Sequence, residues 1–185
     1  FRDLKENKVP NERKTINILN KTIGIVGLGN IGTRVAELAN GLGMKVIAYN
    51  RSLKNIENVE IVDLETLFKE SDFISLHLKT VANQTEGIIN RHLLELCKPT
   101  CFIENQADSK LIIKEDLIYA LENSLIAGYG ATMKEDTKEI EDLENVILAP
   151  ANAWYSDESM NNLKNIWINN IIEFEKGNIV NWVKE

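Results

Sequence analysis

Cysteine, proline and long apolar runs are scarce in this sequence, and each scarcity excludes a class of protein. The 185 residues include 2 Cys and 3 Pro. Cys97 and Cys101 are too few for a disulfide framework, and no neighbouring histidine or cysteine completes a metal-ligand set. We therefore expect buried free thiols and no metal site. No apolar run approaches the roughly 20 residues that span a bilayer, and no signal peptide opens the chain. These absences predict a soluble, cytoplasmic protein.

Positive charge is also in deficit. Lys and Arg number 21 against 28 Asp and Glu, which gives a formal net charge of −7. A nucleic-acid site needs a basic face that neutralises phosphates, so we expect neither a nucleic acid nor a membrane as partner. With 44% hydrophobic and 26% charged residues, the composition is that of a compact globular protein.

Short β-branched runs alternate with helical periodicity along most of the chain. Residues 22–26 predict a buried strand, residues 31–42 a helix, and residues 45–49 a second strand. Further strands are expected at residues 73–78, 100–104, 125–131 and 146–149, and further helices at residues 63–68, 90–96 and 114–123. This alternation predicts an α/β fold, a Rossmann-type doubly wound parallel sheet with helices on both faces.

Two segments near the C-terminus carry weaker signals. The acidic residues 135–144 predict a solvated loop or a short helix. Residues 157–176 predict one long helix, on which Met160, Leu163, Trp167, Ile171 and Phe174 share a face. That stripe is typical of a packing surface rather than of a ligand site.

A glycine-rich motif joins the first strand to the first helix. Residues 27–32 read Gly-Leu-Gly-Asn-Ile-Gly, a G-x-G-x-x-G pattern. Gly27 is expected to make a tight turn, Gly29 to let a diphosphate approach the backbone, and Gly32 to let helix and strand pack closely. Backbone N–H groups and the helix dipole then hold the phosphates. The motif predicts bound NADP or NAD; the alternative is a turn used only for packing.

The end of the second strand bears on the choice of cofactor. NAD-specific folds place an Asp or Glu there for the adenosine ribose, whereas this chain has Asn50, Arg51 and Ser52. Without the carboxylate, nothing repels a 2′-phosphate, and a guanidinium with a hydroxyl can bind it. The triplet favours NADP over NAD, with a surface Arg51 that stacks on adenine as the alternative.

The stretch from Lys21 to Gly32 resembles the D-isomer-specific 2-hydroxyacid dehydrogenases, the family of phosphoglycerate dehydrogenase and hydroxypyruvate reductase. The similarity continues at residues 75–78, 85–90, 98–99, 145–150 and 153–156, the last being similar to the C-terminal-binding corepressors of the family. The resemblance implies a homodimer formed through the cofactor domain. The expected cofactor-binding residues are Gly27, Leu28, Gly29, Asn30, Ile31, Gly32, Asn50, Arg51, Ser52, Leu78, Lys79, Thr85, Gln106, Ala107 and Thr132.

The resemblance also implies a division of the chain. Residues 1–20 are expected to be a lead or linker, residues 21–156 the cofactor domain, and residues 157–185 a C-terminal helix that packs on it. The N-terminal substrate domain of the family is expected to be absent. The chain starts at Phe1 without an initiator methionine, which predicts a processed chain or a cloned fragment.

The same resemblance implies that catalytic side chains are replaced. In the family an Arg binds the keto acid, and a His supported by a Glu moves the proton during hydride transfer. These three positions fall here on Asp108, Ala151 and Thr137, and the family's Asp near the nicotinamide falls on Thr132. Ala151 carries no proton, and Asp108 repels a carboxylate. We therefore expect no catalytic residue, and a degenerate domain that still binds a dinucleotide.

Two alternatives stay open. One is an active oxidoreductase of 2-hydroxy or 2-keto acids, in which Asp108, Lys79, Tyr129 or groups of another domain or chain direct hydride transfer. The other is a protein-interaction module without a cofactor. His77 is a candidate proton donor, but a structural histidine at the end of a strand is the favoured interpretation.

Overall fold

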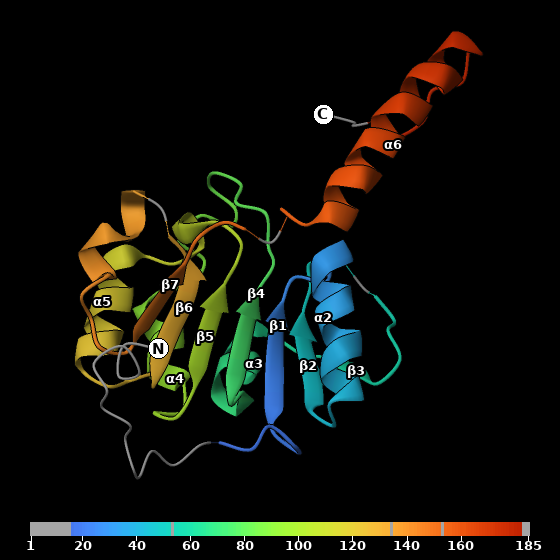
Figure 1. Ribbon diagram of the computed structural model, residues 1–185. Coiled ribbons are helices and arrows are strands. Elements are labelled where there is room, and N and C mark those ends of the chain that lie inside the picture. Colours follow the sequence, from blue (N-terminus) through green and yellow to red (C-terminus); the bar gives the residue numbers. More distant parts are fainter. Residues whose placement is uncertain (1–15, 53, 134, 153, 183–185) are drawn as a thin grey trace. The chain divides into compact units, whose positions relative to one another are not determined.

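The computed structural model describes residues 16–52, 54–133, 135–152 and 154–182 (Figure 1). The chain divides into two compact units, one ending at Leu148 and the other beginning at Ala149.

A single sheet forms the centre of the first unit. Seven strands of the described chain join it in the order β3-β2-β1-β4-β5-β6-β7. They are β1 (Thr22–Val26), β2 (Lys45–Tyr49), β3 (Val59–Ile61), β4 (Phe73–Leu76), β5 (Phe102–Asn105), β6 (Gly128–Thr132) and β7 (Val146–Ala149). Pairing is parallel from β3 through β6, and Val26 at the end of β1 lies between Tyr49 of β2 and Leu76 of β4. The predicted Rossmann-type fold is confirmed, and its crossover places the carboxyl ends of β1, β2 and β4 side by side.

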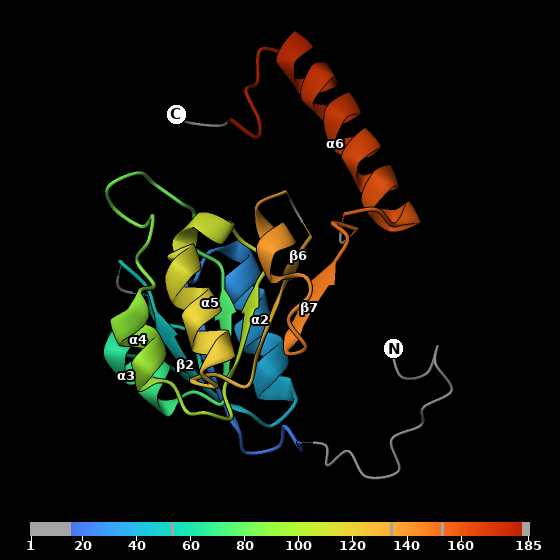
Figure 2. The same cartoon turned by 90° about the vertical axis from the view of Figure 1, so that its left-hand side faces the viewer.

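Helices cover the two faces of the sheet unequally. The helices described in the first unit are α2 (Asn30–Gly41), α3 (Leu64–Glu70), α4 (Arg91–Leu96), α5 (Lys114–Glu122) and the 3₁₀ helices η1 (Ser109–Leu111) and η2 (Glu135–Ile140). Helices α3, α4 and α5 bury one face in a large apolar cluster that includes Phe68, Leu94 and Leu121 (Figures 1 and 2). On the other face α2 forms a smaller cluster with β1 and β2. Each helix thus buries apolar side chains against the sheet, as a parallel sheet requires.

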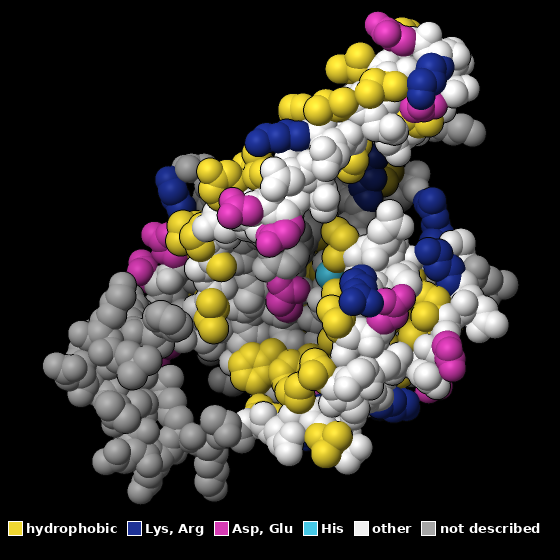
Figure 3. Space-filling model, turned by 45° about the vertical axis from the view of Figure 1, so that its right-hand side comes forward, with side chains coloured by type: hydrophobic (Ala, Val, Ile, Leu, Met, Phe, Trp, Pro, Cys, Tyr) yellow, Lys and Arg dark blue, Asp and Glu magenta, His cyan; other side chains and the backbone are white. Residues whose placement is uncertain are grey.

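Among the described residues of the first unit, no helix covers the part of the second face formed by β4, β5 and β6 (Figures 1 and 2). The rings of Phe73 and Phe102 stack there with centroids 6.1 Å apart, and Phe102 is 39% exposed. Ile147 on β7 is 75% exposed. Hydrophobic side chains are accordingly visible at the surface of this part of the molecule (Figure 3).

Some strand limits differ from the predicted ones because apolar residues continue past the sheet. β4 ends at Leu76 rather than at residue 78, since the Leu78 side chain packs under Gly27 instead of extending the strand. β5 begins at Phe102 because Cys101 N–H donates to the Lys98 carbonyl in a turn, 2.8 Å away.

β6 and β3 differ for related reasons. β6 begins at Gly128 rather than at residue 125, because Leu125 closes the end of α5 by donating to the Ala120 carbonyl at 2.9 Å. β3 was not expected, since a strand of three residues leaves almost no periodicity to detect.

The acidic stretch is a short helix, but its description as solvated is wrong for two residues. η2 turns Thr137 and Ile140 inward, and each is only 3% exposed. The cysteine prediction is confirmed, because Cys97 and Cys101 are both free and buried.

The second unit consists mainly of α6 (Asp157–Glu175). Ser156 caps it by accepting a hydrogen bond from Ser159 N–H at 3.2 Å, and Asp157 and Glu158 complement the dipole in its first turn. No described residue of α6 is buried, and Trp167 on the predicted stripe is 60% exposed. Even so, no helix in the part of the chain that the structure describes is long and apolar enough to cross a membrane.

Candidate functional site

The glycine-rich turn is tight and depends on its first glycine. Gly27 has a φ of +102°, which lies in the region that favours glycine. A Cβ on Gly27 would also lie 3.0 Å from the backbone of His77 and Leu78. The Gly27 N–H donates to the Tyr49 carbonyl at 2.8 Å, so the turn is fixed to the end of β2.

The second and third glycines of the motif have opposite surroundings. A Cβ on Gly32 would overlap the carbonyl oxygen of Gly27, so only glycine lets α2 approach the turn this closely. A Cβ on Gly29 would meet nothing within 4 Å. Among the residues that the structure describes, none fills the space in front of Gly29 at the start of the helix.

The N-terminus of α2 is arranged for an anion. The first N–H groups of any helix lack partners within it, and no side chain caps those of α2. Its first turn also contains no acidic residue. By contrast, Asp63 caps α3 and Asn90 caps α4 with their own side chains. An uncapped positive helix end beside an open glycine is a suitable binding site for a phosphate group.

Asn50 connects the glycine turn to the loop that follows β2. Its Oδ1 accepts from Leu28 N–H at 3.0 Å. Its Nδ2 donates to the carbonyl oxygen of Ser52 at 2.7 Å and to the Ser52 hydroxyl at 3.0 Å. Asn50 thus has a structural role, and the Leu28 N–H is already committed to it.

Three described residues after β2, Arg51, Ser52 and Lys54, are exposed and are cationic or polar. Arg51 donates to Gln84 Oε1 at 3.0 Å, across a separation of 33 residues. Lys54 reaches back to donate to the carbonyl oxygen of Leu28. Lys54 is not among the cofactor residues expected from the sequence. The only sequence signal was a second cation shortly after Arg51, and the loop geometry alone shows where its charge lies.

The remaining expected cofactor residues lie at the carboxyl ends of the strands or in the loops that follow them. Thr85 Oγ1 donates to the Lys79 carbonyl at 2.8 Å and accepts from Val81 N–H at 2.7 Å, which closes the loop after β4. Thr132 Oγ1 donates to Gln106 Oε1 at 2.7 Å, which joins the ends of β5 and β6. Because all these strands are parallel, the expected residues share one edge of the sheet.

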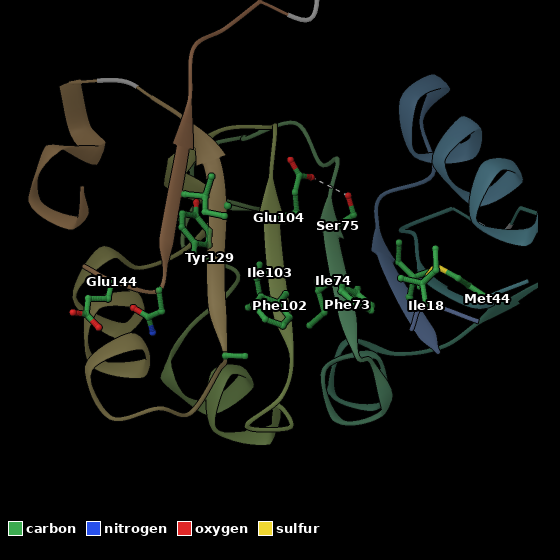
Figure 4. A pocket seen from close by; sticks show the side chains of 15 residues that line it. Ile18, Met44, Phe73, Ile74, Ser75, Phe102, Ile103, Glu104, Tyr129 and Glu144 are labelled. Carbon is green, nitrogen blue, oxygen red and sulfur yellow. Dashed lines mark hydrogen bonds between the residues drawn. The ribbon is translucent and has the colours of Figure 1, made fainter. Parts of the chain in front are cut away.

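His77 belongs to a polar cluster on the incompletely covered face. Its Nε2 lies 2.9 Å from Ser75 Oγ, which donates to Glu104 Oε2 at 3.1 Å. Figure 4 shows Ser75 and Glu104 pointing toward each other from β4 and β5. Burial lowers the pKa of His77, and the Glu104 carboxylate partly opposes this effect. The contacts agree with a structural histidine.

An apolar hollow of the first unit is a feature separate from the glycine turn. A cavity of about 580 Å³ lies on the incompletely covered face, with Phe73, Phe102 and Tyr129 in its lining (Figure 4). None of its lining residues belongs to the glycine motif or to the loop after β2. Its apolar walls offer little to a diphosphate, so the cavity and the carboxyl edge of the sheet are distinct.

The positions expected for the catalytic Arg, Glu and His hold other residue types. Asp108 caps η1, its Oδ1 accepting from Lys110 N–H at 3.1 Å. Thr137 lies buried in η2, and Ala151 is an exposed residue of the second unit.

A parallel sheet with a tight glycine turn, leading into an uncapped helix at its carboxyl edge, defines a dinucleotide-binding Rossmann domain. Residues 2–153 match the family model described as the NAD-binding domain of D-isomer specific 2-hydroxyacid dehydrogenase. The chain therefore belongs to the D-isomer-specific 2-hydroxyacid dehydrogenase family and carries its NAD-binding domain.

Individual relatives agree with this assignment. The chain is 39% identical over 167 residues to glyoxylate reductase of Thermococcus litoralis, covering 86% of this chain and 50% of that protein. It is 37% identical over 174 residues to hydroxypyruvate reductase of Blautia hydrogenotrophica, covering 89% and 53%. A solved acyclic imino acid reductase in complex with NADPH and D-Arg superposes with a TM-score of 0.89 at 35% identity, covering 99% of this chain and 61% of that one. The chain thus spans about half the length of the two reductases it matches.

Proposed function

We propose that this domain binds NADP(H) in preference to NAD(H). The observation that carries the proposal is the loop after β2, where Asn50 replaces the expected carboxylate and spends its amide on internal hydrogen bonds. Arg51 and Ser52 are exposed beside it and can donate to a 2′-phosphate. The NADPH in the acyclic imino acid reductase supports the same choice.

In the proposed arrangement Gly29, Asn30 and Ile31 at the start of α2 would hold the diphosphate, and the residues at the end of β2 would hold the adenosine. Leu78, Lys79 and Thr85 border the middle of the cofactor, and Gln106, Ala107 and Thr132 lie at its nicotinamide end. When bound, the cofactor would donate a hydride to a substrate carbon in its reduced form or accept one in its oxidised form. The chain's own residues bind and orient it, and the buried Leu28 side chain anchors the turn beneath it.

We also propose that the chain is degenerate as a 2-hydroxyacid dehydrogenase. Asp108 is committed to capping η1, and Ala151 has no titratable group. No Arg occurs between Lys98 and Asp116, and no His follows His92. Loss of a catalytic unit typically costs several powers of ten in rate.

The names of the relatives favour a second candidate, a reductase of a small carbonyl or imino acid that uses other catalytic groups. The consumption of NADPH with glyoxylate, hydroxypyruvate, pyruvate and imino acids separates the two candidates. Turnover at an ordinary enzymic rate supports the reductase, and no turnover of any of them supports the degenerate domain.

Two matched variants test dinucleotide binding itself. Gly29 lies at the start of α2 and Gly41 at its end, and a Cβ on either would meet nothing within 4 Å. Gly29→Ala should fold normally but weaken NADPH binding by about tenfold or more, because its methyl group occupies the path of the diphosphate. Gly41→Ala should leave binding unchanged. Calorimetric silence of the unmodified chain toward millimolar NADPH and NADH would favour the interaction module instead.

Two further proposals concern assembly. Because Phe102 and Ile147 expose apolar surface on β5 and β7, we propose a homodimer formed through the cofactor domain, to be tested by analytical ultracentrifugation. We also propose that the chain is divided into an N-terminal linker (residues 1–20), a cofactor domain (residues 21–156) and a C-terminal helical segment (residues 157–185). Limited proteolysis can test this division.

A further inference from the structure

We infer that Lys54 is a further specificity-determining residue of the cofactor site, one that distinguishes NADP from NAD by binding the 2′-phosphate. The inference rests on the proposed function, since it assigns a residue to the proposed 2′-phosphate site. Its starting observation is the hydrogen bond that Lys54 Nζ donates to the carbonyl oxygen of Leu28, 26 residues earlier in the chain.

That contact fixes the position of the charge. Leu28 is fixed by two contacts, because its side chain is fully buried and its N–H donates to Asn50 Oδ1. Thr33 Oγ1 lies 3.4 Å from the same carbonyl oxygen. An ammonium group that binds a carbonyl fixed in this way lies between the glycine turn and the loop after β2, where the diphosphate and the adenosine ribose of a bound cofactor would meet.

The ammonium group has capacity left for a phosphate. A lysine has three N–H donors, and one of them serves Leu28. Among the residues that the structure describes, no carboxylate forms an ion pair with Lys54 or Arg51. A 2′-phosphate carries close to two negative charges, so two cations neutralise it where Arg51 alone would not.

Asn50 positions the Ser52 hydroxyl, the third group that we assign to the 2′-phosphate beside Arg51 and Lys54. By donating to the Ser52 carbonyl and hydroxyl oxygens, it holds the hydroxyl on the loop that also carries Arg51 and Lys54. Ser52 supplies a hydroxyl hydrogen bond, Arg51 a planar fork of donors, and Lys54 a compact point charge. NAD lacks the 2′-phosphate, so the remaining N–H donors of Lys54 and Arg51 would have no anion to bind.

Lys54→Met tests the inference, because it keeps the length of the side chain and removes the charge. Lys45→Met is the matched control, since Lys45 is also an exposed β2-region lysine but lies at the opposite end of the strand, 3.5 Å from Glu60. Affinities for NADPH, NADH, 2′-AMP and 5′-AMP are measured by calorimetry on the full chain. Thermal unfolding of each variant checks that it folds.

Lys54→Met should weaken the binding of NADPH and 2′-AMP by about tenfold or more, whereas the affinities for NADH and 5′-AMP should change by less than about twofold. Lys54→Arg should retain most of the preference, and Lys45→Met should change none of the four affinities. Equal losses for NADPH and NADH would overturn the inference, because the charge would then serve the diphosphate or the turn. Unchanged NADPH binding would also overturn it. Failure of the unmodified chain to bind either dinucleotide is a different result, which removes the proposed function itself.

Discussion

Gly32 in the first turn of α2 lies directly against the carbonyl oxygen of Gly27, with no room for a methyl group between them. This contact sets the distance between helix and turn on which the open space at Gly29 depends. Gly32→Ala should therefore force α2 away from β1. We expect a loss of about 1–3 kcal/mol in the free energy of unfolding, measured by urea denaturation, together with weaker NADPH binding.

Gly41→Ala provides the comparison for this variant. Gly41 is the last residue of the same helix, and a Cβ there would meet nothing within 4 Å. The change should be neutral or stabilising by up to about 1 kcal/mol, because alanine favours the helix. If Gly32→Ala unfolded at the same urea concentration as Gly41→Ala, the close packing of turn and helix would not be an energetic constraint.

A second prediction concerns His77 and Glu104. Burial holds the pKa of His77 below its ordinary value, and the Glu104 carboxylate raises it part of the way back. Glu104→Gln removes the raising effect and keeps an acceptor for the Ser75 hydroxyl, so the pKa of His77 should fall further. The measurement is an NMR titration of the two histidine side chains.

His92 serves as the internal reference in that titration. It is exposed on α4 and lies 3.2 Å from Glu65. A pKa of His77 that stays constant or rises in Glu104→Gln would show that the carboxylate does not act on the imidazole through this cluster.

The order of strands and helices follows from the sequence because its causes are local. Val26 ends a β-branched run, Gly27 interrupts it, and the apolar steps of α2 begin directly afterwards. Strand limits are less predictable, because Leu78 and Leu125 are apolar for reasons of tertiary packing rather than of strand pairing. A periodicity rule cannot distinguish the two causes.

The roles of individual side chains in the cofactor site are also only partly predictable from the sequence. The triplet Asn50-Arg51-Ser52 indicates a phosphate, but the sequence does not reveal that Asn50 is used internally. Lys54 was missed because its contact spans 26 residues and depends on the path of the loop. Such long-range hydrogen bonds leave no periodic signal in the sequence.

A third prediction concerns stability and pH. Asp72 accepts from Thr22 N–H at 2.9 Å and from Lys98 Nζ at 3.0 Å, which ties the starts of β1 and β4 to the turn before β5. Burial opposes ionisation of Asp72, but these two donors outweigh it, so the pKa of the carboxyl is lowered. Asp72→Asn should cost about 1–3 kcal/mol at neutral pH, measured by urea denaturation.

The sign of the pH dependence follows from the lowered pKa. A carboxyl with a lower pKa in the folded chain stabilises the fold at pH values above its pKa in the unfolded chain, which is about 4. This contribution is lost as the pH falls through the pKa of the carboxyl in the folded chain. The stability curves of the two proteins should therefore converge in acid. A difference that persisted undiminished below the folded pKa would point to packing rather than charge.

The last prediction concerns Asn50→Asp, a change that alters charge with almost no change in shape. An aspartate can still accept from Leu28 N–H, but it cannot donate to the Ser52 oxygens that Nδ2 now contacts at 2.7 and 3.0 Å. Its carboxylate would repel a 2′-phosphate and accept hydrogen bonds from a free ribose hydroxyl. NADPH affinity should fall by about tenfold or more while NADH affinity holds or improves, which calorimetry with both dinucleotides measures. Ser52→Ala gives the comparison, since it removes a donor to the phosphate without adding charge and should weaken NADPH without improving NADH. If Asn50→Asp weakened both dinucleotides equally, the loop after β2 would serve the shape of the glycine turn and not the choice of cofactor.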